Sequence, residues 1–197
     1  MLIRGTGIRL RATNDMLTTM KRPTLYLDYD GVLHAEDVRV RRGKPPIIYE
    51  DNKPSDRPLF EHLALLDELL LPYPDLVIVL ATSWVRQLGY ERAREHLTPS
   101  LQARLIGATW HSHMKFDDFR GYNSGMIPFD NFTRYQTILA DATRRGNDRW
   151  LALDDNIEGW PVDQLHRVVA PTDPILGLAQ PGKADELRIA LAKLCEV

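Results

Sequence analysis

The segment Leu25–His34, with the sequence LYLDYDGVLH, constrains the fold more than any other part of the chain. It is an apolar run that ends in two carboxylates one residue apart, followed by a glycine. Residues two apart on an extended strand point the same way, so we expect Asp28 and Asp30 to project together beyond the carboxyl end of a buried strand. Open α/β sheets bind their ligands at that edge. Gly31 permits a sharp exit of the chain there.

The spacing of the two acids predicts a metal-assisted nucleophile site. Carboxylates this close repel each other unless a cation or a shared proton relieves them, and hard oxygen ligands of this kind suit Mg²⁺. The alternative reading of Asp28, Asp30 and Gly31 is a strand that runs into an acidic turn, because Asp and Gly are common turn formers. The rest of the chain has to decide between the two.

Beyond this strand, the chain alternates strand-like and helix-like segments, which is typical of a doubly wound parallel sheet. The fold class is therefore predicted as α/β, a three-layer arrangement with helices on both faces of the sheet. Further strands are expected at about 76–81, 105–109, 150–153 and 166–170. Helices are expected at about 59–70, 85–97, 99–104, 133–144 and 183–194.

The length of 197 residues and a hydrophobic content of 44% are enough for one domain with a substantial core. We predict a flexible tail over residues 1–20 and a single catalytic domain over 21–197, with a flap at about 34–55. A formal net charge of −2 gives no global basic field for nucleic acid. The single cysteine, Cys195, fits a reducing cytoplasm, and no apolar run approaches the roughly 20 residues that span a bilayer. The sequence does not define the oligomeric state.

The arrangement of Asp28, Asp30 and Gly31 after a hydrophobic strand resembles motif I of the haloacid dehalogenase (HAD) superfamily, in the DxDG form of its phosphatase branch. The resemblance implies that Asp28 attacks phosphorus and that Asp30 acts as general acid and base. A dehalogenase proper lacks the second aspartate. Asp30 therefore favours phosphoryl chemistry over cleavage of a carbon–halogen bond.

Two later segments resemble motifs II and III of the same superfamily. The apolar run 76–81 ends in Thr82 and Ser83, whose hydroxyls can bind a phosphoryl oxygen or simply cap the helix that follows. Arg134 opens a helical pattern and takes the place of the motif III cation, which neutralises the nucleophile and the phosphate. Lys115 is a competing candidate, and a solvated helix residue is the other reading of Arg134.

A third segment, Trp150–Asn156, runs from a short apolar strand into the adjacent acids Asp154 and Asp155 and resembles motif IV. The resemblance implies that these acids complete a Mg²⁺ shell beside Asp28 and the backbone carbonyl of Asp30. Asp155 is expected to be a direct ligand, and Asp154 a ligand directly or through water. The alternative is a pair of acids in a surface turn.

The gaps at 34–55 and 110–132 are too short for the separate cap domain that sets substrate choice in much of the superfamily. A capless site implies large substrates such as nucleic-acid ends or proteins, or a cap from a partner subunit, and small molecules remain open. Possible substrate contacts are the basic side chains of the flap and one aromatic side chain: Arg39, Arg41, Arg42 and Trp84. The alternative is solvated loop charges and a core tryptophan.

The order of these motifs, with Gly177 and Leu178 before the last helix, is similar to the small HAD domains associated with RNA-repair proteins. The expected function is a Mg²⁺-dependent phosphohydrolase that forms an aspartyl-phosphate from a phosphomonoester, either a small molecule such as a nucleotide or a polynucleotide end. Two alternatives stay open. One is an inactive HAD fold that serves as a binding or regulatory module, and the other is a phosphotransferase with an acceptor other than water.

Overall fold

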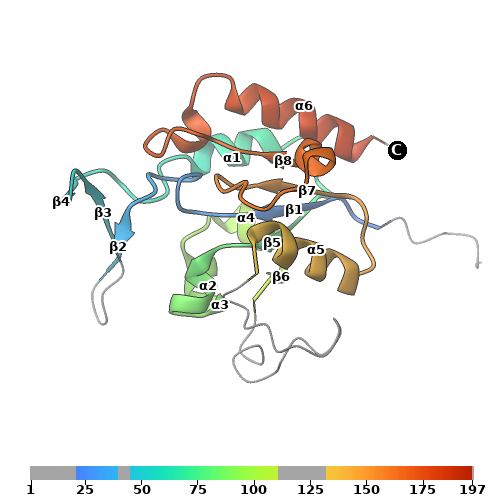
Figure 1. Cartoon of the computed structure of the whole chain (residues 1–197), viewed down its shortest axis with the longest axis horizontal. Coiled ribbons are helices and arrows are strands. Elements are labelled where there is room, and N and C mark those ends of the chain that lie inside the picture. Colours follow the sequence, from blue (N-terminus) through green and yellow to red (C-terminus); the bar gives the residue numbers. More distant parts are fainter. Residues whose placement is uncertain (1–20, 40–44, 111–131, 197) are drawn as a thin grey trace, which may run out of the picture.

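The computed structural model describes residues 21–39, 45–110 and 132–196, so the predicted tail at 1–20 lies outside the described residues. A five-stranded sheet forms the centre, with the order β6-β5-β1-β7-β8 and every neighbouring pair parallel (Figure 1). Its strands are β1 (Thr24–Leu27), β5 (Val77–Leu80), β6 (Leu105–Ala108), β7 (Trp150–Leu153) and β8 (Val168–Val169). The chain winds outward from β1 in both directions, which confirms the predicted doubly wound α/β fold.

The three central strands are apolar and buried along their whole length, as parallel strands covered on both faces must be. Their register places Leu27 opposite Leu80 on one side and opposite Leu153 on the other. The three strands therefore end at the same level. The residues that follow them emerge at one edge of the sheet.

Helices cover both faces of the sheet (Figure 1). On one face, Leu25 and Leu27 pack in a cluster with buried leucines of α1 and α6, and on the other face Tyr26 packs in a cluster with Ile138 of α5. The helices are α1 (Leu63–Leu70), α2 (Ser83–Leu88), α3 (Tyr90–Glu95), α4 (Pro99–Arg104), α5 (Arg134–Arg144) and α6 (Lys183–Cys195), with 3₁₀ turns at Val162–Arg167 and Gly177–Ala179. The alternation of side chains along β1 thus produces two cores.

Two predicted helices differ from the observed ones. The helix expected at 59–70 begins only at Leu63, because Phe60 has a positive φ of 60° and its ring is buried between Tyr29 and Trp84. The helix expected at 85–97 is divided, because Gly89 adopts a φ of 91° between α2 and α3. In the first case tertiary packing overrides the local start signal, and in the second the glycine ends one helix and begins another.

A second, antiparallel sheet lies within the predicted flap region, at the margin of the molecule (Figure 1). It contains β2 (Val38–Arg39), β3 (Ile47–Glu50) and β4 (Lys53–Pro54). Asp51 and Asn52, both with positive φ, form the tight turn between β3 and β4. This small sheet is no cap domain. Among the described helices, none is long and apolar enough to cross a membrane.

Candidate active site

The first residues after β1 and β7 are acidic and almost completely buried. Asp28 is 3% exposed and Asp154 is 0% exposed. Their backbones continue the sheet, since the Asp28 amide donates to the Leu153 carbonyl at 3.0 Å and the Asp154 amide to the Val169 carbonyl at 3.2 Å. The ladder therefore fixes where both side chains begin.

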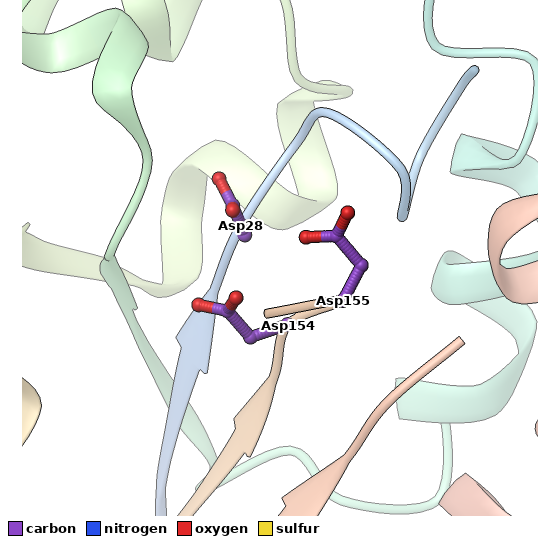
Figure 2. A group of neighbouring side chains, drawn as sticks. All are labelled: Asp28, Asp154 and Asp155. Atoms are coloured by element: carbon purple, nitrogen blue, oxygen red, sulfur yellow. The ribbon is translucent and has the colours of Figure 1, made fainter. Parts of the chain in front are cut away.

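Asp28, Asp154 and Asp155 converge beyond the ends of these strands (Figure 2). One carboxylate oxygen from each lies within 4.8 Å of the others. The structure thus brings together three of the predicted metal ligands from segments more than 120 residues apart in the chain. The resemblance also implies that the backbone carbonyl of Asp30 is a metal ligand, and this role stays a prediction.

Gly31 makes room for Asp155. It has a φ of +66°, and a Cβ atom at this position would stand 2.2 Å from Asp155 Oδ2, with the Asp155 Cγ at 2.7 Å. The glycine is therefore required both for the turn after β1 and for the close approach of the motif IV loop.

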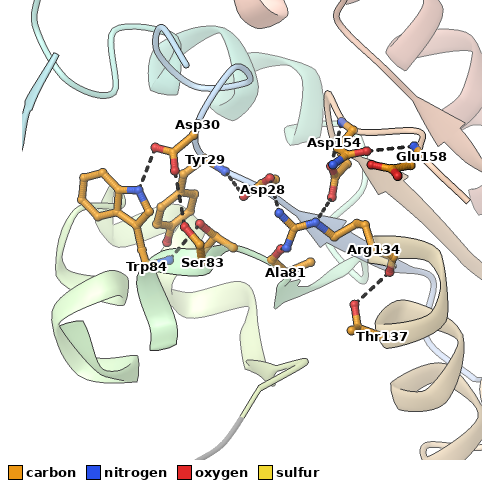
Figure 3. A network of polar contacts seen from close by, with 12 residues as sticks. Asp28, Tyr29, Asp30, Ala81, Ser83, Trp84, Arg134, Thr137, Asp154 and Glu158 are labelled. Carbon is orange, nitrogen blue, oxygen red and sulfur yellow. Dashed lines mark hydrogen bonds and ion pairs between the residues drawn. The ribbon is translucent and has the colours of Figure 1, made fainter. Parts of the chain in front are cut away.

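Arg134 stands between two of the acids at the start of α5 (Figure 3). Its Nη2 donates to Asp28 Oδ2 at 2.7 Å, its Nε lies 2.8 Å from Asp154 Oδ2, and its Nη1 donates to the Ala81 carbonyl. Thr133 caps the helix in a reciprocal capping box with Gln136, which fixes the first turn that carries the arginine. Arg134 thus occupies the place expected of the motif III cation, and Lys115 lies outside the described residues.

The charges of the three acids Asp28, Asp154 and Asp155, here called the acid cluster, favour the binding of a cation. Burial raises the pKa of Asp28 in spite of the opposing charge of Arg134, and it raises the pKa of Asp154 further, with the Asp28 charge adding to the effect. Burial and the Asp28 charge raise the pKa of Asp155 to about 7. Three carboxylates facing one guanidinium leave two negative charges unbalanced when all are ionised.

The donor set fits a divalent cation of the Mg²⁺ type. Asp154 Oδ2 is buried and forms its ion pair with Arg134 without an aligned hydrogen bond, and it has no hydrogen-bond donor among the described residues. Buried carboxylate oxygens without donors are expensive unless a metal or a proton satisfies them. All three side chains offer hard oxygen atoms, the ligands that Mg²⁺ prefers.

Asp30, the predicted general acid and base, lies beside this cluster and is partly exposed. Its Oδ1 accepts a hydrogen bond from Trp84 Nε1 at 2.8 Å (Figure 3). The same oxygen lies 3.1 Å from His34 Nε2. Its Oδ2 lies 3.5 Å from Ser83 Oγ. The two aspartates of motif I therefore have different surroundings, Asp28 in the acid cluster and Asp30 in a polar contact with aromatic rings.

Thr82 serves as the N-cap of α2, since its side chain accepts from the Trp84 amide at 3.3 Å. Thr82 and Ser83 also line a cavity of about 300 Å³. The capping role is thus confirmed for Thr82, and phosphoryl binding by the two hydroxyls stays a prediction. The cavity is lined by Thr82, Ser83, Arg86, Thr109, Trp110, Phe132, Arg134, Thr137 and Asn156. Its lining combines aromatic rings with polar side chains and includes Arg134, whose guanidinium can bind a phosphate group.

The prediction that Trp84 contacts substrate by stacking is wrong. Its side chain is only 1% exposed, and its ring packs against Phe60, with centroids 5.2 Å apart, and against His96 at 5.0 Å. The alternative of a core tryptophan is the correct one, because Trp84 in the first turn of α2 is enclosed by these rings. Arg39, on β2, is paired with Asp37 in the loop before that strand, and Arg41 and Arg42 lie outside the described residues.

Sequence reasoning missed His34, which is 0% exposed and touches Asp30. The only signal in the sequence is a histidine at the end of an otherwise apolar stretch, four residues after Asp30. That spacing alone does not distinguish a buried partner from a surface residue.

The family model for the HAD domain in Swiss Army Knife RNA repair proteins matches residues 24–182. No significant match was found among curated proteins or among solved structures. HAD domains are in general hydrolases and phosphotransferases that use Mg²⁺, in keeping with the acid cluster at the end of β1 and β7. The match spans the sheet, the acid cluster and Arg134, and the chain therefore belongs to this family of HAD domains.

Proposed function

We propose that the protein is a Mg²⁺-dependent phosphohydrolase that removes the phosphoryl group of a phosphomonoester through an aspartyl-phosphate on Asp28. The observation that carries the proposal is the convergence of three carboxylates within 4.8 Å at the edge of the sheet, where Arg134 bridges two of them and also lines the cavity. A merely acidic turn would not bury Asp28 and Asp154 beside a shared arginine.

In the first step, a carboxylate oxygen of Asp28 forms a bond to phosphorus while the bond from phosphorus to the ester oxygen breaks. Asp30 gives its proton to the departing oxygen, so the leaving group departs as an alcohol. Asp28 enters this step ionised and Asp30 enters it protonated. The products are the aspartyl-phosphate and an ionised Asp30.

In the second step, the ionised Asp30 takes a proton from water as the water oxygen attacks phosphorus. The bond from phosphorus to the Asp28 oxygen breaks, which restores the Asp28 carboxylate and the protonated Asp30 and releases inorganic phosphate. The covalent intermediate divides one difficult displacement into two easier ones.

Asp28, Asp154 and Asp155 would hold the Mg²⁺ ion, which would supply charge neutralisation between the carboxylates and the phosphoryl group. Arg134 would bind the phosphoryl oxygens as well. Of its five N–H groups, contacts with described residues use three, and two can donate to phosphate. Thr82 and Ser83 line the same cavity and are proposed to bind phosphoryl oxygens there.

The substrate is proposed to be a nucleotide or a polynucleotide end. The support is the description of the matched family, which concerns RNA repair proteins, and the lack of a large cap over the described sheet edge. A screen of phosphate release across nucleotides, 3′- and 5′-phosphorylated oligonucleotides, sugar phosphates and phosphopeptides tests this choice.

Phosphate release from 4-nitrophenyl phosphate in the presence of Mg²⁺ tests the reaction itself. Asp28→Asn should abolish release, because an amide oxygen is a far weaker nucleophile. Asp185→Asn, at an exposed acid on α6 that pairs only with Arg188 among the described residues, should not change it. Substrate binding without release would favour an inactive binding module. Release of 4-nitrophenol with the phosphoryl group on an added alcohol, and not in inorganic phosphate, would favour a phosphotransferase.

A further inference from the structure

We infer that Trp84 and His34 are positioning residues that orient the carboxyl group of Asp30 for proton transfer, an inference that rests on the role of Asp30 in the proposed function. Two ring nitrogens from different parts of the fold meet the same oxygen of this residue. Trp84 Nε1, from α2, donates to Asp30 Oδ1 at 2.8 Å (Figure 3). His34 Nε2, from the loop after β1, lies 3.1 Å from that atom.

The hydrogen-bonding pattern identifies the donor nitrogen of His34. Its Nδ1 is buried and has no hydrogen-bond partner among the described residues. A proton on Nδ1 would be stranded in an apolar environment, while the lone pair of Nε2 would face the Asp30 oxygen. The ring therefore carries its proton on Nε2 and donates to Oδ1, as the Trp84 indole does.

Packing holds both donors in place. His34 is 0% exposed and Trp84 is 1% exposed. Phe60 lies edge-on to both rings, with centroids 4.6 Å from His34 and 5.2 Å from Trp84, and His96 lies edge-on to Trp84 at 5.0 Å. Neither ring can turn away from Asp30 without repacking this cluster. Donors held this way are organised before the substrate arrives.

The two donors determine which oxygen of Asp30 delivers the proton. Oδ1 already accepts two N–H groups, so the proton of the acid form stands on Oδ2. Oδ2 lies 3.5 Å from Ser83 Oγ, and Ser83 lines the cavity beside Arg134. The acidic proton is thereby directed toward the place where the ester oxygen leaves. The bonds to Oδ1 persist when that proton has been transferred.

A pair of substrates that differ in their need for an acid tests this inference. 4-Nitrophenol leaves as a stable anion, whereas 4-nitrobenzyl alcohol has to be protonated as it leaves, and the two phosphate esters are of nearly equal size. The measurement is kcat/KM for both esters, which reports steps up to formation of the aspartyl-phosphate. Trp84→Phe should lower kcat/KM for the benzyl ester about tenfold more than for the phenyl ester.

His34 supplies an independent pair of variants in case Trp84→Phe does not fold. His34→Leu removes the donor and should change the ratio of the two kcat/KM values in the same direction. His34→Gln keeps an amide N–H near the position of Nε2 and should restore the ratio toward the wild-type value. Trp150→Phe, in the other core at the start of β7, should leave the ratio unchanged.

Equal losses with both esters in Trp84→Phe and His34→Leu would overturn the inference and show a purely structural role. A wild-type protein that turns over neither ester would instead overturn the proposed function, and the inference would fall with it. Circular dichroism of each variant establishes that the comparison is made on folded protein.

Discussion

At the scale of single residues, the site depends on the close approach of two loops as much as on the chemistry of its side chains. Gly31 and Asp155 lie far apart in the sequence. The turn after β1 leaves room for the Asp155 carboxylate only because Gly31 has no side chain. The sequence predicted the glycine for its backbone freedom. It did not predict this contact, because the distance between the two loops depends on the register of β1 and β7.

Gly31→Ala should therefore displace Asp155 and lower activity by at least about a hundredfold, because a misplaced group near the reacting atoms costs on this order. Gly89→Ala is the matched control, since Gly89 also has a positive φ but a Cβ there meets no atom within 4 Å. Both variants place a side chain at positive φ, and at Gly89, with φ 91° and ψ 157°, the backbone penalty is about 1–3 kcal/mol because this region is essentially confined to glycine. Steady-state phosphate release and thermal unfolding separate the effects, and equal activity in the two variants would contradict the role given to Gly31.

Asp155→Asn should have opposite effects on stability without and with Mg²⁺. Without metal, removal of one of three crowded carboxylates relieves repulsion and should raise Tm by about 2–4 °C, which corresponds to roughly 1 kcal/mol for a chain of this size. With saturating Mg²⁺, the wild-type protein should gain Tm and the variant should gain little. Thermal unfolding with EDTA and with Mg²⁺ measures both. A variant that is less stable under both conditions would count against a metal site.

At the scale of helices and strands, prediction from sequence succeeded where local signals and tertiary packing agree. The strands at β1, β5 and β7 are continuous apolar runs, and α4 and α5 begin at the cap residues Thr98 and Thr133. Prediction from sequence failed where tertiary packing determines the local structure. The ring of Phe60 packs against His34, Trp84 and His96 in an aromatic cluster, so α1 begins later than predicted. The same cluster buries Trp84, for which the sequence left a substrate contact and a core position open.

The aromatic cluster should make stability depend on pH. Burial lowers the pKa of His96, whose ring stacks on Phe60 with centroids 4.9 Å apart. The unfolded chain therefore takes up a proton more readily than the folded protein, so this contribution to stability is present above about pH 6.5 and is lost as pH falls through the lowered value. Tm measured between pH 7.5 and 5 should fall less in His96→Gln than in the wild type. His166→Gln, at an exposed position, should follow the wild-type curve.

At the scale of the whole molecule, the described fold places a small antiparallel sheet, rather than a cap domain, in the long connection between β1 and α1. Sequence length alone predicted this, because the connection is too short for a separate domain. The choice of substrate could not be predicted in the same way. Arg41, Arg42 and Lys115 lie outside the described residues, and the chemistry of the cavity fits many phosphate esters.

A substrate-length series measures how open the site is. If the site accepts polynucleotide ends, kcat/KM for a phosphorylated oligonucleotide should equal or exceed that for the corresponding mononucleotide, because the chain beyond the terminal phosphate meets no cap. Oligonucleotides of one to eight residues with the same terminal nucleotide provide the comparison. A steady fall of kcat/KM with length would favour a small metabolite instead.

β1 is the middle strand of the five, and the amide of Asp28 donates to the Leu153 carbonyl. Amides of this kind exchange with deuterium only when the whole domain opens, whereas those at sheet margins exchange through local fluctuations. Native-state exchange should accordingly find the Asp28 amide among the slowest in the protein. The nucleophile Asp28 would then belong to the part of the chain that unfolds last. The residues that contact the substrate around Asp28 would remain free to move.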